Sequence, residues 1–266
     1  MKFGAVGDLH GDFDALDRIM ARHRDVAFWL CPGDLASDAG EYPRPRAPLY
    51  WIKGNNEDFD FVASQPAGSG TIANLHYIPN GVQIEAHGLK LAGLGGTFAP
   101  TWYDRTPADL IDRARPKRRE SAGGVGPIRV PASGAQAGIG APAAKNGSGG
   151  ASAPARKDDK RRHFVHAEAD ACRQLRGIDV FVSHEAPRPF LLETTRALGV
   201  ARKIDAGKTP INEILEAMQP RMHLFGHHHK YSVDERQNVP SIGLDMVSES
   251  YLIFDGKTLA HQRVKS

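Results

Sequence analysis

The stretch Lys2-Phe3-Gly4-Ala5-Val6-Gly7-Asp8-Leu9-His10-Gly11 lies at the start of the sequence and decides the fold class. Its first six residues form a short and mostly apolar run, which predicts a buried strand. Asp8 and His10 follow directly, in a turn bounded by glycines. Because glycine lets the backbone turn sharply and approach a ligand closely, this segment predicts a strand that ends at a binding site.

Two further strand-like runs end in the same way. Residues 26–30 lead to Gly33-Asp34, and residues 49–53 lead to Gly54-Asn55-Asn56-Glu57. Apolar residues at helical spacing predict a helix from 12 to 24, between the first two strands. Strands that alternate with helices indicate an α/β fold, in which polar residues meet at the carboxyl ends of the strands.

The rest of the chain continues with strands and helices. Residues 76–98 predict successive antiparallel hairpins, because short apolar runs are separated by Pro79-Asn80-Gly81 and His87-Gly88. Helices are expected at 168–176 and 211–218, and hairpin-like strands at 242–246 and 251–254. Strands at 180–183 and 222–226 lead to His184 and to Gly226-His227-His228-His229.

The length of 266 residues fits a single domain over 1–266 that contains an insertion. Gly, Ala, Ser and Pro dominate residues 121–155, which therefore cannot bury enough apolar surface to offset the entropy of ordering. We expect a disordered insertion at about 119–160. Basic clusters flank it; they predict either a solvated charge run or an electrostatic collar for a phosphate-rich substrate.

Composition favours a cytoplasmic protein. The net charge is only +3, which by itself does not indicate nucleic acid, and no apolar stretch is long enough to span a membrane. The two cysteines, Cys31 and Cys172, lie far apart and follow no CxxC spacing. They therefore indicate neither a disulfide framework nor a thiolate metal site, and a reducing compartment is expected.

The polar residues at the strand ends form a candidate metal centre of seven side chains: Asp8, His10, Asp34, Asn55, His184, His227 and His229. Carboxylate and imidazole suit Mn²⁺, Fe²⁺ or Zn²⁺, and Mg²⁺ is a further candidate. Seven ligands exceed what one tetrahedral ion accepts, but they serve two divalent metal ions if one carboxylate bridges them. Two ions about 3.5 to 4 Å apart can hold a bridging hydroxide that attacks phosphorus. We therefore expect a binuclear metal-dependent phosphoric ester hydrolase.

Each of these residues also has a plainer interpretation when it is taken alone. Asp8 or Asp34 could cap the following helix, and His184 could be a hydrogen-bonded core histidine. The run from His227 to His229 could be the polar surface of a turn. Compatible ligands at five separate strand ends argue against coincidence.

The ordered set of turns resembles the calcineurin-like metallophosphoesterases. It consists of Gly-Asp-Leu-His-Gly at 7–11, Gly-Asp at 33–34, Gly-Asn-Asn-Glu at 54–57, Ser-His-Glu-Ala-Pro at 183–187 and Gly-His-His-His at 226–229. The resemblance implies two mixed β-sheets packed face to face with flanking helices, a four-layer α/β sandwich. It also implies the division of the ligands: Asp8, His10 and His229 for one ion, Asn55, His184 and His227 for the other, and Asp34 as the bridge.

Asn56 departs from the family pattern. Members that hydrolyse phosphomonoesters efficiently carry a histidine there that assists the leaving group, and an amide cannot donate a proton as a general acid. The departure favours a phosphodiester substrate. His228 could replace the missing acid, but its side chain is expected to point away from its two ligand neighbours, which favours a surface role.

The middle of the chain more loosely resembles the RNA lariat debranching enzymes, through residues 74–78, 92–98, 161–164 and 178–184. Those enzymes carry Cys in place of Asp8 and His in place of Asn56, so debranching activity does not transfer directly to this chain. A debranching-like nuclease is kept as an alternative function. Arg161, Arg162 and His163 could bind substrate phosphate, or they could form only a basic helix start. A non-catalytic metal-binding scaffold is a further alternative. A phosphate ester is the expected substrate, nucleic acid is a possible partner, no membrane is expected, and the oligomeric state is left open.

Overall fold

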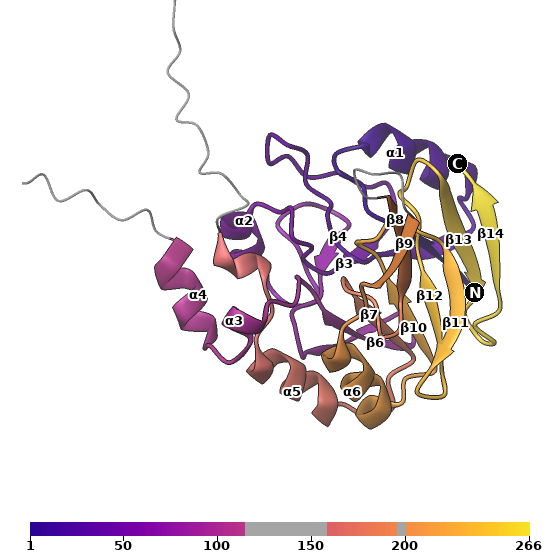
Figure 1. Cartoon of the computed structure of the whole chain (residues 1–266). Helices are drawn as coiled ribbons and strands as arrows, with labels where there is room; N and C mark the ends of the chain where they lie inside the picture. The colour runs from indigo at the N-terminus through magenta and orange to yellow at the C-terminus, as the bar shows by residue number, and fades with distance from the viewer. Residues whose placement is uncertain (115–158, 196–200) are drawn as a thin grey trace, which may run out of the picture.

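The computed structural model describes residues 1–114, 159–195 and 201–266. Two mixed sheets of six strands each form the body of the protein (Figure 1). The first sheet has the order β14 (His261–Lys265), β13 (Ser250–Asp255), β1 (Lys2–Val6), β2 (Val26–Cys31), β3 (Leu49–Trp51) and β4 (Leu75–Tyr77). The second has the order β11 (Ser232–Arg236), β12 (Val239–Gly243), β10 (Met222–Phe225), β7 (Val180–Ser183), β6 (Leu89–Leu94) and β5 (Gln83–Ala86).

The described helices are α1 (Phe13–Arg22), α2 (Phe59–Ala63), α3 (Pro100–Tyr103), α4 (Pro107–Ala114), α5 (His166–Gln174) and α6 (Thr209–Met218). Helix α1 buries Leu16, Ile19 and Met20 at helical spacing, and its N-cap Asp12 accepts a hydrogen bond from the Ala15 amide at 3.0 Å. None of the described helices is long and apolar enough to cross a membrane.

Three apolar layers hold these elements together. Alternate residues of the two sheets, such as Phe3 and Phe28 of the first and Val182 and Leu224 of the second, form the core between them. On the outer face of the first sheet, Trp29 and Trp51 pack in the cluster that contains the apolar face of α1. The opposite outer face of the second sheet packs against α5 and α6 through residues such as Phe181, Cys172 and Ile214. The expected four-layer α/β sandwich is therefore confirmed.

Parallel pairing brings the site residues to one edge. β1, β2, β3 and β4 are mutually parallel neighbours in the first sheet, as are β6, β7, β10 and β12 in the second. Their carboxyl ends therefore lie on a common side of each sheet. The predicted strands at 2–7, 26–30, 49–53, 180–183 and 222–226 all have counterparts in this arrangement.

Two predictions of strand pairing are wrong. The segment 76–98 is not a series of hairpins, because β4 pairs in parallel with β3 in the first sheet and only β5 and β6 form an antiparallel hairpin. The two last predicted strands do not pair with each other either. β12 belongs to the second sheet and β13 to the first, since residues 244–249 cross between the sheets.

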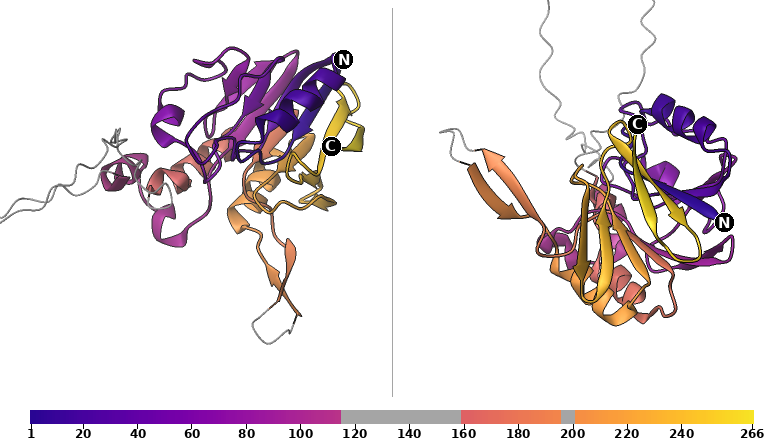
Figure 2. Two further views of the ribbon diagram at one scale, coloured as in Figure 1. Left: turned by 90° about the horizontal axis from the view of Figure 1, so that it is seen from above. Right: turned by 90° about the vertical axis from the view of Figure 1, so that its right-hand side faces the viewer.

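A separate hairpin was not predicted. β8 (Leu191–Thr195) pairs with β9 (Ala201–Asp205) and projects from the body of the protein as an arm (Figure 2). The expected insertion at about 119–160 lies outside the described residues, except for its last two positions.

His223 of β10 is a buried histidine that the predicted site did not include. Its Nε2 lies 2.8 Å from the Ser183 hydroxyl and its Nδ1 lies 3.2 Å from the Ser241 hydroxyl. Burial lowers the pKa of this imidazole to about 3, so the folded protein keeps it neutral.

We expect this histidine to make the protein less stable in acid. Between about pH 6.5 and 3 the unfolded chain binds a proton at His223 and the folded chain does not, so the free energy of unfolding falls as the pH falls. The contribution is about 1.4 kcal/mol per pH unit. His223→Gln should remove it from the pH dependence of urea unfolding, whereas the same change at the partly exposed His261 should not. An identical slope in wild type and His223→Gln would contradict the assignment.

Candidate metal centre

Six of the seven predicted ligands gather into two groups at the edge shared by the two sheets. Within each group the ligand atoms lie within 4.8 Å of one another. The first group is Asp8, His10 and His229, and the second is Asp34, His184 and His227. Each group combines residues that follow β1 or β2 of the first sheet with residues that follow β7 or β10 of the second.

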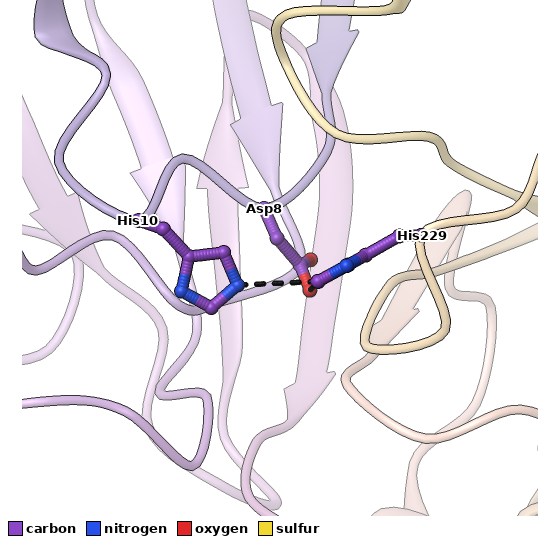
Figure 3. A group of neighbouring side chains, drawn as sticks. All are labelled: Asp8, His10 and His229. Atoms are coloured by element: carbon purple, nitrogen blue, oxygen red, sulfur yellow. Dashed lines mark hydrogen bonds and ion pairs between the residues drawn. The ribbon is translucent and has the colours of Figure 1, made fainter.

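The first group places two imidazoles and a carboxylate around one point (Figure 3). His10 Nε2 lies 3.1 Å from His229 Nε2, which lies 3.1 Å from Asp8 Oδ2. The hydrogen bond to Asp8 raises the pKa of His229 against the opposing effect of burial, and the charge of that carboxylate adds to the rise. Asp8 Oδ2 also accepts the His227 amide at 2.9 Å, which ties the first strand end to the turn 226–229.

The second group is more deeply buried and includes Asn55. His184 is fully buried, and its Nδ1 lies 2.7 Å from the Pro32 carbonyl, which assigns the proton to Nδ1. Its Nε2 lies 3.0 Å from Asn55 Oδ1 and 3.7 Å from Asp34 Oδ1. Burial opposes the charged imidazole, but the charges of Asp34 and Asp8 outweigh it and raise the pKa of His184. Burial, and then the charges of neighbouring histidines, lower the pKa of His227 to about 2, so this imidazole is neutral and free to act as a ligand at neutral pH.

Asp34 lies between the two groups. Its Oδ2 is 3.6 Å from His10 Nε2 and its Oδ1 is 3.7 Å from His184 Nε2. One carboxylate oxygen therefore faces each group, as a bridging ligand requires. The backbone amide of Asn56 donates a hydrogen bond to Asp34 Oδ1 at 2.7 Å and fixes the carboxylate in this orientation.

The donor set fits two divalent cations. Imidazole nitrogens and carboxylate or amide oxygens face one another in both groups, at distances where two lone pairs repel unless a proton or a cation lies between them. The ligand roles of these seven residues remain predictions, whereas their convergence is a property of the fold.

The backbone of four of these residues is strained. His10, Asp34, His227 and His229 have φ of 46°, 52°, 66° and 49°, in the left-handed region that side chains with a Cβ disfavour. Each such residue costs on the order of 1 kcal/mol. Strain of this kind concentrates where side chains must be aimed at a functional centre.

Two glycines leave room for the carboxylates. A Cβ at Gly54 would overlap Asp34 Oδ1, and a Cβ at Gly226 would overlap Asp8 Oδ1. Neither overlap is sterically possible, so any larger residue at these positions would displace a predicted ligand.

Glu57 is a functional residue to which the sequence analysis gave no role. It is fully buried, and its carboxylate accepts the amides of Leu35 at 3.1 Å, Ala36 at 3.3 Å and Gly54 at 3.2 Å. The Tyr42 hydroxyl donates a fourth hydrogen bond at 2.9 Å. Burial, followed by the charge of Asp34, raises the pKa of Glu57 to about 7.

Glu57 thus holds the turn after β2 against the turn after β3. Its place directly behind Asn55 and Asn56 was a usable signal, because a carboxylate close to a buried strand end needs partners. Tyr42 carried no such signal, since it lies in an irregular segment far from any ligand in sequence.

Asn56 lies beside the first group. Its side-chain amide is 3.4 Å from His10 Nδ1, on the side of that imidazole away from His229. The residue that replaces the family histidine therefore contacts a predicted ligand.

His228 does not have the surface role that was expected. Only 9% of its side chain is exposed, its ring stacks on Phe190 with centroids 5.0 Å apart, and its Nε2 lies 3.7 Å from Glu185 Oε2. It belongs to neither ligand group. Burial, and then the charge of Lys208, lower the pKa of His228 to about 4.

The predicted substrate-binding segment lies next to the third turn. Lys53, which precedes Gly54, donates from Nζ to the carbonyls of Arg161 at 3.0 Å and His163 at 3.2 Å. Arg161 already pairs with Asp159 and Asp60, and His163 Nδ1 lies 3.0 Å from the Thr97 hydroxyl. The segment is thus close to the centre, but the charge of Arg161 is compensated within the protein.

We expect Gly226→Ala to weaken binding of Mn²⁺ by at least about 10-fold, because the added methyl group would displace Asp8. Titration calorimetry on metal-free protein measures this affinity. Gly88→Ala is the control for added backbone strain away from the centre, since Gly88 has φ of 82° and a Cβ there meets nothing within 4 Å. Equal Mn²⁺ affinity in Gly226→Ala and wild type would remove Asp8 from the ligand set.

Comparison with known proteins agrees with this geometry. A search of curated proteins finds no match. Among solved structures, TT1561 of Thermus thermophilus aligns with a TM-score of 0.56 at 10% identity, covering 99% of this chain and 98% of that one. A further solved structure aligns with a TM-score of 0.57 at 10% identity, over 99% and 98% of the two chains. At these identities the alignments show a shared fold.

The family comparison is more specific. Residues 1–117 match the family model of the calcineurin-like phosphoesterases. That range contains the turns with Asp8, His10, Asp34 and Asn55, and the fold brings His184, His227 and His229 to the same place. Residues 1–117 therefore carry the match to the calcineurin-like phosphoesterases, and the rest of the chain completes a fold of the same type.

Proposed function

We propose that this protein is a binuclear metal-dependent phosphodiesterase. The observation that carries the proposal is the position of Asp34, which presents one carboxylate oxygen to each of two ligand groups. Two divalent ions held there would polarise the phosphate and supply a nucleophile at neutral pH. Mn²⁺, Fe²⁺ and Zn²⁺ suit the mixture of imidazole and carboxylate better than Mg²⁺ does.

The substrate would approach the first ligand group. The side chains of His10 and His229 are 29% and 39% exposed, whereas that of His184 is fully buried. The second group is thus more deeply buried than the first, which is more open to solvent. Asn56, next to His10, lies where a substrate would enter.

Asn56 supports a diester rather than a monoester. The amide can orient a ligand or hydrogen-bond a phosphate oxygen, but it supplies no proton to a leaving group. A site of this kind therefore favours substrates whose leaving group needs little protonation. The two cysteines are free and buried, in keeping with our further proposal of a reducing, cytoplasmic location.

A nuclease of the debranching type is the second candidate. The observation that favours it is Lys53, which anchors residues 161–163 beside the turn that carries Asn55 and Asn56. Phosphate contacts by this segment would make oligonucleotide binding weaken steeply with salt. Absence of both binding and cleavage at low salt would exclude this candidate and leave the phosphodiesterase proposal in place.

Asp34→Asn should abolish hydrolysis of bis(p-nitrophenyl) phosphate, and the same variant should contain less bound metal. Both effects are expected because both ligand groups lose the shared carboxylate. Metal content is measured by mass spectrometry after reconstitution with Mn²⁺, Zn²⁺, Fe²⁺ and Mg²⁺ in turn. Asp38→Asn is the control, since that carboxylate is exposed in the same loop. Full activity of Asp34→Asn would refute the bridging role, and wild type that binds metal without turnover would indicate the scaffold.

Asn56→His should shift the substrate preference toward monoesters. The ratio of kcat/KM for p-nitrophenyl phosphate to that for bis(p-nitrophenyl) phosphate is expected to rise, by about 10-fold or more, because imidazole can donate a proton to the leaving oxygen. Aryl leaving groups need little protonation, so the shift should be larger for an alkyl phosphate. If the ratio of monoester to diester kcat/KM is unchanged for both aryl and alkyl monoesters, Asn56 does not determine the preference between monoesters and diesters.

A further inference from the structure

A buried polar cluster lies next to the candidate metal centre and includes none of the predicted ligands. It consists of Glu185, His228 and Lys208, whose side chains are 2%, 9% and 26% exposed. Glu185 directly follows the predicted ligand His184, and His228 lies between the predicted ligands His227 and His229.

The two buried members face each other through polar atoms that lack a hydrogen bond. Glu185 Oε1 accepts the Phe98 amide at 3.0 Å, but Glu185 Oε2 and His228 Nε2 each have no hydrogen-bond partner among the described residues. These two atoms are 3.7 Å apart, and Lys208 Nζ is 3.8 Å from the same Oε2. Burying a carboxylate oxygen and an imidazole nitrogen without such mutual compensation is unfavourable, so the pair is a feature that packing alone does not explain.

The ring of His228 is fixed in place by its other contacts. It stacks on Phe190 with ring centroids 5.0 Å apart, and its centroid lies 4.8 Å from that of His227. Its backbone amide donates to the Gly226 carbonyl at 2.7 Å. Since His227 and His229 on either side have left-handed backbones, a shift of the His228 ring would be transmitted to both neighbours.

The cluster joins three separate segments of the second sheet and its helix layer. Glu185 follows β7, His228 follows β10, and Lys208 is the N-cap of α6, with its amide donating to the Ala186 carbonyl at 2.9 Å. The turns after β7 and β10 provide His184, His227 and His229. The contact between Glu185 and His228 therefore connects the two turns of the second sheet that carry predicted ligands.

We propose that Glu185 is a positioning residue for the metal centre: it holds His228, and through it the turn 226–229, at the distance from His184 that metal binding requires. Lys208 compensates the remaining charge of the carboxylate. This role rests on the proposed metal-dependent function, and it concerns the affinity for metal rather than the chemical step. It also explains why a histidine occupies position 228 although its side chain is not among the ligands.

The test compares Glu185→Leu, His228→Phe and the double variant with wild type. His228→Phe retains a ring to stack on Phe190 but removes the nitrogen that faces Glu185. Two quantities are measured: the affinity and stoichiometry of Mn²⁺ binding by titration calorimetry, and the midpoint of thermal unfolding of the metal-free protein.

Both single variants should bind Mn²⁺ at least about 10-fold more weakly, as is usual when an outer partner of a ligand is removed. The double variant should regain metal-free thermal stability relative to the singles, because no buried group is left uncompensated. Its Mn²⁺ affinity should stay low, and the two losses should not add, since both substitutions break one contact. A purely structural pair would instead restore affinity together with stability.

His223→Gln is the control, because it alters a buried histidine of β10, the strand that precedes His228. His223 contacts the hydroxyls of Ser183 and Ser241 and not Glu185, so its replacement should leave Mn²⁺ affinity unchanged. Wild-type Mn²⁺ affinity in Glu185→Leu, or in the double variant, would overturn the positioning role. Failure of wild type itself to bind Mn²⁺ would instead overturn the proposed function, so the two failures are distinguishable.

Discussion

The centre depends on one carboxylate that lies between two sheets. Asp34 lies in the turn after β2 of the first sheet, and its two oxygens face His10, which follows β1 of that sheet, and His184, which follows β7 of the other. Its own contacts leave the carboxylate little freedom. The backbone amide of Asn56 donates a hydrogen bond to one oxygen, and only glycine fits at position 54, against the same oxygen. Because each ligand group also draws residues from both sheets, the face-to-face packing of the sheets is what forms the site.

That packing also explains which part of the structure could be predicted from sequence. Asp8, Asp34, Asn55, His184 and the turn 226–229 follow short apolar strands directly, and parallel pairing brings all strand ends of a sheet to one edge. Local pattern was therefore sufficient to predict which of these side chains converge. The pairing of β4 was not predictable in this way, because Pro79-Asn80-Gly81 is a turn sequence in either arrangement. In this fold Asn80 instead bonds to Gly95 after β6 and completes a crossing from the first sheet to the second.

The residues that support the ligands were hidden for a different reason. Tyr42 reaches Glu57 across fifteen positions of sequence, and His228 reaches Glu185 across the space between two strand ends. Such contacts depend on tertiary distance, and nothing in the local sequence records them. His228 illustrates the error that follows. Alternation along the turn correctly predicted that its side chain leaves the ligand groups, but its burial against Phe190 depends on the residues that follow β7.

The energetic balance of the site follows from the same geometry. Left-handed backbone at four predicted ligands, a buried Glu57 and polar atoms that approach so closely that they need a proton or a cation between them all disfavour the metal-free folded state. The apolar layers on both sides of each sheet supply the stability that tolerates these costs. Divalent cations bound to ligands of both sheets would remove the lone-pair repulsion and join the sheets at one edge, so metal affinity and fold stability are linked by mass action. Because the residues of each ligand group come from both sheets, a substitution that loosens the core between the sheets should also weaken metal binding.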